Sequence, residues 1–137
     1  MTSRWNATRA LLDAKLMTLS GITESIVSFP GRTFTPPTSG TWYKVNLIPT
    51  ACDSALGVGG YTNERGVYQV SIFNKPGDAQ PGATLAAVDA LVNLFDRATL
   101  TGTGLSVQCE VPVPGPSMNE PDWIQTPVSI RFTTKGA

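Results

Sequence analysis

Apolar and polar side chains alternate along residues 67–73, which read Val-Tyr-Gln-Val-Ser-Ile-Phe. A repeat of two residues is typical of a β-strand with one buried face and one wet face. Residues 74–78 (Asn-Lys-Pro-Gly-Asp) then form a dense group of turn formers. From Leu85 to Phe95 the apolar positions recur every three or four residues, which predicts a helix with one apolar face. We therefore expect a strand that leads through a Pro/Gly-rich loop into a helix, with the rest of the chain packed on this unit.

The same two periods predict further elements on both sides of this unit. A first helix is expected over residues 4–19, capped by Ser3 and ended by Gly21. The central strand is expected to begin near residue 61 and to bend or bulge at Gly66. The other expected strands, in chain order, are residues 22–29, 41–48, 105–111 and 123–133.

This order of elements predicts an α+β fold in one domain, residues 1–137. We expect a mainly antiparallel β-sheet of about four to five strands with two α-helices packed on one face. Trp42 and Tyr43 are neighbours on a strand and should point to opposite faces. Pro127 predicts that the last strand lies at an edge or carries a bulge. Residues 32–40, 49–60 and 112–121 are expected to be loops.

Composition and charge exclude several classes of function. The chain has 10 Lys and Arg against 10 Asp and Glu, so its formal net charge is zero. Proteins that bind nucleic acid without sequence recognition neutralise phosphates with basic residues, and no basic run is present here. No apolar stretch approaches the length that spans a membrane. We expect a soluble, intracellular protein with no nucleic-acid sequence recognition and no membrane contact.

The residues that most often carry chemistry are scarce. The chain has no histidine, the commonest general base and metal ligand. Its two cysteines, Cys52 and Cys109, are expected to be reduced thiols, although the sequence does not decide whether they pair. Glu120 and Asp122 lie close in sequence, but a solvated loop end accounts for them better than an acid/base pair. We therefore predict no catalytic residue, no cofactor and no metal.

Aromatic residues and prolines in or beside the expected loops are more informative. Phe34 is followed by two prolines, and Trp123 follows Pro121. Aromatic residues and arginine anchor protein interfaces, so we predict a protein interface here. The alternative is that these rings fold back over the ends of the sheet and complete the core. The residues predicted for the interface are Arg32, Phe34, Trp42, Arg65, Tyr68, Asp122 and Trp123.

The arrangement as a whole resembles the tail terminator-like proteins of long-tailed bacteriophages. The resemblance runs from the first helix to the final strand and includes the Phe-Pro-Gly at residues 29–31. Its sharpest part is residues 64–72 (Glu-Arg-Gly-Val-Tyr-Gln-Val-Ser-Ile), followed by a helix that ends in Leu94-Phe95.

The resemblance implies a structural protein with no catalytic site and no cofactor. Members of this family form a ring, commonly of six subunits, on the last ring of the tail tube. They stop tube polymerisation and present a surface for joining the head. The implied partners are other copies of the chain, the tail tube protein and a head-completion or connector protein. The implied location is the tail of the virion, assembled in the cytoplasm of the bacterial host.

Two alternatives remain open from the sequence. One is another head–tail connector or tail completion protein of similar build. The other is a small α+β enzyme or ligand-binding protein, with a pocket between the sheet and the glycine-rich residues 57–60. If the interface prediction holds, Trp42→Ala or Phe34→Ala leaves a folded monomer that assembles less well.

Overall fold

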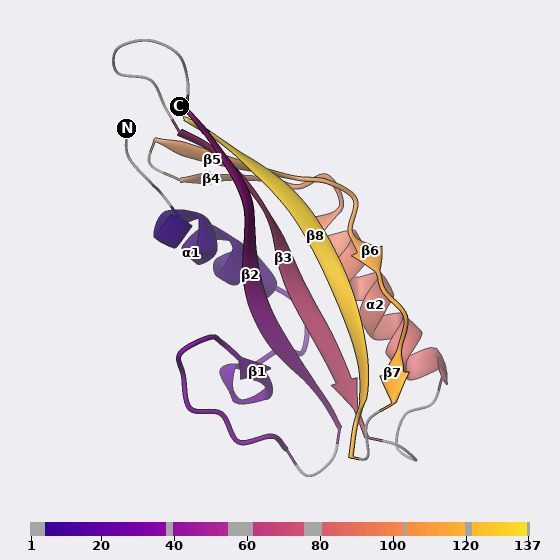
Figure 1. Cartoon of the computed structure of the whole chain (residues 1–137). Helices are drawn as coiled ribbons and strands as arrows, with labels where there is room; N and C mark the ends of the chain where they lie inside the picture. The colour runs from indigo at the N-terminus through magenta and orange to yellow at the C-terminus, as the bar shows by residue number, and fades with distance from the viewer. Residues whose placement is uncertain are drawn as a thin grey trace.

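Three long strands form the centre of the sheet, and the predicted central strand lies between the other two (Figure 1). They are seen in a computed structural model that describes residues 5–37, 40–54, 62–75, 81–102, 104–119 and 122–136. The strands are β2 (Thr41–Ser54), β3 (Thr62–Asn74) and β8 (Ile124–Gly136). Both β2 and β8 pair with β3 in the antiparallel sense.

Shorter strands extend the sheet at both sides, in the order β1-β2-β3-β8-β5-β4. The pairing of β1 with β2 is parallel, and the other pairings are antiparallel. Two further strands, β6 and β7, pair with β8 beside β5. The sheet is therefore mixed but mostly antiparallel, and it curls along its length (Figure 1). The short strands are β1 (Val27–Ser28), β4 (Thr99–Gly102), β5 (Leu105–Cys109), β6 (Val113–Pro114) and β7 (Met118–Asn119).

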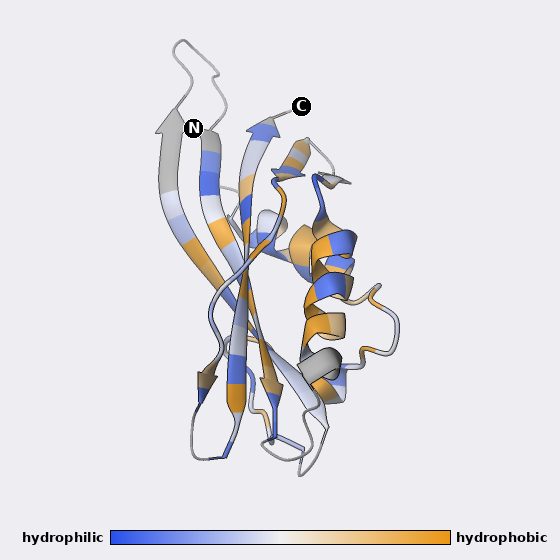
Figure 2. Cartoon of the chain, turned by 90° about the vertical axis from the view of Figure 1, so that its right-hand side faces the viewer, coloured by the Kyte–Doolittle hydropathy of each residue, from blue (hydrophilic) through white to orange (hydrophobic). Residues whose placement is uncertain are grey.

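Two helices, α1 (Trp5–Leu16) and α2 (Pro81–Phe95), lie on the same side of the sheet (Figure 2). We call the covered side the inner face and the opposite side the outer face. Along β3, Tyr68, Val70 and Ile72 point inward and are completely buried. They pack with Leu12 and Leu16 of α1, with Leu91 and Phe95 of α2, and with the inward residues of β5 and β8. The α+β fold with two helices on one face of the sheet is thus confirmed.

The structure corrects several predicted boundaries. Residues 22–29 do not form one strand, because a 3₁₀ turn occupies Glu24–Ile26 and only Val27–Ser28 pairs with β2. The first helix ends at Leu16 and is followed by turns. β4 was missed in the sequence because its four residues are mostly exposed and show no alternation. Its partner β5 alternates cleanly and was predicted.

Two prolines sit where a strand tolerates them. Residues 49–54 belong to β2 and not to a loop, and the register shifts between Pro49 and Ala51, opposite Gly66. The irregularity predicted at Gly66 is therefore carried by the partner strand. Pro127 lies inside β8, where its carbonyl accepts a 2.7 Å hydrogen bond from the Gly115 amide. Because N–H and C=O of one residue point to the same side in an antiparallel ladder, the missing N–H of Pro127 faces this short, irregular pairing and not β3.

Candidate assembly surface

Four aromatic rings gather at one end of the outer face. Trp42 and Phe73 are Cα partners on β2 and β3, and their rings stack with centroids 4.0 Å apart and planes 8° apart. Phe34 lies 5.0 Å from Trp42, and Trp123 meets Trp42 edge-on at 5.7 Å. Tyr43 points to the inner core, so the two neighbours face opposite ways as predicted. We call Phe34, Trp42, Phe73 and Trp123 the aromatic cluster.

The aromatic cluster combines buried and half-buried rings. Trp42 is 8% exposed and Phe73 is 6% exposed, whereas Phe34 and Trp123 are half-buried. The ammonium of Lys75 lies 5.7 Å from the centre of the Trp123 ring. Asp122, next to Trp123, is exposed. The structure therefore brings together three of the residues predicted for an interface, and these rings also cover the end of the sheet in the subunit itself.

The other predicted residues lie elsewhere. Arg32 is exposed and stands over the Phe29 ring at 5.4 Å, near α1. Arg65 is exposed on the outer face, at the other end of β3. Tyr68 is completely buried on the inner face, and its hydroxyl donates a 2.5 Å hydrogen bond to Asp13. Burial raises the pKa of the Tyr68 phenol far above its usual range, and the negative charge of Asp13 raises it further. Tyr68 thus joins β3 to α1 within one subunit.

The outer face beyond the aromatic cluster carries basic and apolar side chains. The register places Lys44, Arg65, Arg131 and Lys135 on this face, and all four are exposed. Ile48, Val113 and Met118 are Cα partners of outward residues and are 43%, 61% and 45% exposed. A hollow of about 440 Å³ lies here between Arg65, Arg131 and Glu110. Among these residues only Arg65 is predicted from the sequence, because alternation assigns a residue to a solvent-facing side of a strand but does not show which residues share a patch.

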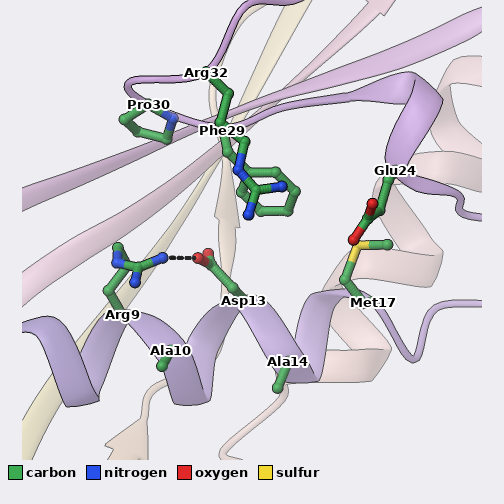
Figure 3. Close-up of a pocket in the computed structure, with 9 residues that line it drawn as sticks. All are labelled: Arg9, Ala10, Asp13, Ala14, Met17, Glu24, Phe29, Pro30 and Arg32. Atoms are coloured by element: carbon green, nitrogen blue, oxygen red, sulfur yellow. Dashed lines mark hydrogen bonds and ion pairs between the residues drawn. The ribbon is translucent and has the colours of Figure 1, made fainter.

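A second hollow, of about 260 Å³, lies between α1 and residues on both sides of β1 (Figure 3). Arg9 and Asp13 line it from α1 and form a 2.8 Å ion pair, while Phe29 and Arg32 line the opposite wall. Glu24 lies at one end of this hollow (Figure 3). Its charges are of both signs, and it contains no nucleophile and no set of metal ligands.

The described residues contain no metal-ligand group and no reactive thiol. They contain no group of three or more His, Cys, Asp or Glu side chains that could hold a metal. Cys109 is a free, buried thiol, and burial raises its pKa to about 11, so it is protonated near neutral pH. The side chain of Cys52, residues 57–60 and Glu120 lie outside what the structure describes. Within the described ranges, none of the helices is long and apolar enough to cross a membrane.

A family of known proteins matches most of this chain. The sequence model of a family described as phage tail terminator protein matches residues 7–132. No curated protein matches the chain. One solved structure that carries no functional description is similar, with a TM-score of 0.77 and 23% sequence identity. The alignment covers 100% of this chain and 99% of the other, and at this identity it shows a shared fold alone.

Proposed function

Since the chain belongs to the phage tail terminator protein family, we propose that it caps the tail tube as a ring, ends tube polymerisation and provides the surface that joins the head. The observation that carries the proposal is the family match, which runs from α1 almost to the end of β8. The family is structural, and the chain is a component of the phage tail. We propose a ring of six copies, assembled in the host cytoplasm, with the tail tube protein and a head-completion or connector protein as partners.

The molecular surface supports an assembling role. A ring contact between identical subunits is heterologous, so each copy must present two different patches that fit each other. The exposed parts of Phe34, Trp123 and Asp122 form one proposed contact region at an end of the sheet. Arg32 and Arg65 are exposed elsewhere and are proposed for contacts with neighbouring subunits or the tube. Trp42 is buried beneath Phe34 and Trp123, and Tyr68 is buried against α1. For both residues we propose a role inside the subunit and not a direct contact with a neighbour.

Electron microscopy of the purified protein mixed with growing tubes of the matching tube protein tests this function. We expect density at one tube end and arrest of further growth. The control is the same tube preparation without the protein, which should continue to lengthen. Tubes that keep lengthening and carry no cap in the presence of the protein would contradict the proposal and favour a connector role elsewhere in the particle.

A further inference from the structure

We propose that the outer face of the sheet packs against α2 of the next copy in a heterologous, head-to-tail contact. This inference rests on the proposed ring and names the two surfaces that close it. Figure 2 shows α2 on one side of the sheet and the outer face on the other. A subunit can therefore use both surfaces at once, each toward a different neighbour, as a ring requires.

Most of the large apolar side chains that are exposed among the described residues fall on these two surfaces. Among the described residues, five large hydrophobic side chains are exposed. Ile48, Val113 and Met118 lie on the outer face, and Val111, which is 50% exposed, lies in the segment that leads to β6. The fifth is Leu85 on α2, which is 62% exposed. Because large exposed apolar groups mark contact sites when they gather, their concentration here favours burial of one surface by the other.

The charges of the two surfaces are complementary. The described outer face carries the basic residues Lys44, Arg65, Arg131 and Lys135 together with the acid Glu110, and Asp122 lies beside the aromatic cluster at its end. The segment of α2 (Pro81–Phe95) contains no basic residue. Its exposed residues Leu85, Asp89 and Asn93 are four apart and form one stripe. Just beyond the helix end, Asp96 is ion-paired with Arg97 at 3.1 Å, so Asp89 is the acid that this stripe presents. The stripe on α2, with an apolar residue and an acid, therefore complements the apolar and basic outer face of the sheet.

The same charges argue against the symmetric alternative. Two outer faces that packed on each other across a two-fold axis would bring basic residues against basic residues. Juxtaposed like charges cost several kcal/mol at an interface, which disfavours that pairing. A chain of zero net charge with a basic sheet face must carry its excess acid elsewhere, and α2 holds part of it. Head-to-tail contact instead places Asp89 of α2 against the basic outer face.

Charge reversal with rescue tests this contact. The variants are Arg131→Glu on the outer face, Asp89→Arg on α2, and the double variant. Native mass spectrometry would measure the oligomers in solution, and electron microscopy would measure rings at tube ends. We expect each single variant to associate at least about tenfold more weakly, and the double variant to regain most of that loss because the pair is restored with opposite polarity. The matched control is Glu24→Arg, an exposed carboxylate on neither surface, which should assemble as the unmodified protein does.

The outcomes separate this contact from the proposed function. Single variants that assemble and cap tubes normally, or a double variant no better than the singles, would overturn the contact while the capping role stands. An unmodified protein that forms no ring in solution or on tubes would overturn both. Circular dichroism and thermal melting would check that the variants fold. If Arg131→Glu does not fold, Lys44→Glu tests the same face.

Discussion

The hydroxyl of Tyr68 donates a 2.5 Å hydrogen bond to Oδ1 of Asp13, and so joins the middle of β3 to α1. The other carboxylate oxygen of Asp13 accepts a 2.8 Å hydrogen bond from Arg9, one helical turn earlier. Arg9 also donates to the side chain of Asn6. Since Tyr68 is completely buried, this bond fixes how the helix lies on the sheet.

Replacing the Tyr68 hydroxyl should therefore weaken the fold. We expect Tyr68→Phe to lower the free energy of unfolding by about 1–3 kcal/mol, because Asp13 loses a partner in a part-buried site. Urea unfolding followed by circular dichroism would measure the change. The matched control is Tyr43→Phe, since Tyr43 is buried in the same core but makes no hydrogen bond through its hydroxyl among the described residues. Equal losses for both variants would contradict the role assigned to the Tyr68–Asp13 bond.

The protein should lose stability in alkali. Burial raises the pKa of Tyr68 above its ordinary value of 10.0, and burial raises that of Cys109 from 9.0 to about 11. Both groups keep their protons in the folded state at pH values where the unfolded chain releases them. Their contributions to the free energy of unfolding are therefore complete below the pKa values of the unfolded chain. These contributions are lost as the pH rises from those values toward the higher pKa values of the folded state.

Urea unfolding at about pH 8 and about pH 10.5 would measure this loss. We expect a lower free energy of unfolding at the higher pH. Tyr68→Phe and Cys109→Ala should each reduce the difference between the two conditions, because each removes one of the shifted groups. A free energy that is the same at both pH values would be at odds with the buried placement of these side chains.

Gly66 should not accept a side chain. A Cβ at this position would lie 2.8 Å from the carbonyl oxygen of Ile48 and 2.9 Å from Cζ of Phe132. We expect Gly66→Ala to cost about 1–3 kcal/mol, since β2 or the Phe132 ring must shift. Gly102→Ala is the matched control, because its Cβ would meet Leu11 at 3.4 Å, an ordinary contact. Thermal melting of both variants would check this, and a Gly66→Ala protein as stable as the Gly102→Ala protein would refute it.

Two rings of the aromatic cluster should behave differently. Trp42 is 8% exposed and is stacked on Phe73, so we expect Trp42→Ala to lower the free energy of unfolding by about 3–5 kcal/mol. Phe34 is half-buried, so Phe34→Ala should leave a folded subunit that assembles less well on tube ends. Thermal melting and electron microscopy of capped tubes would separate the two effects. A Phe34→Ala protein that caps tubes as efficiently as the unmodified one would remove this ring from the proposed contact.

The local repeats determined much of this protein. Alternation along β3 and β5 and the three-to-four spacing in α2 predicted these elements, their buried faces and the α+β fold. The resemblance to tail terminators, read from the same stretch, is confirmed by the family match. Such signals are local, because the period of a strand or helix is fixed by backbone geometry within a few residues.

Tertiary structure decided the strand registers and the contacts between distant side chains, because both depend on residues far apart in the chain. Pro49 remains in a strand because β2 shifts its register against β3, and β1 is short because only two of its residues reach β2. Phe34 and Trp123 are separated by most of the chain, yet both pack on Trp42. The bond between Tyr68 and Asp13 joins positions 55 residues apart. The sequence by itself indicates which side chains are apolar, which are charged and which are expected to face solvent. Only the register of the paired strands determines which of them share a face.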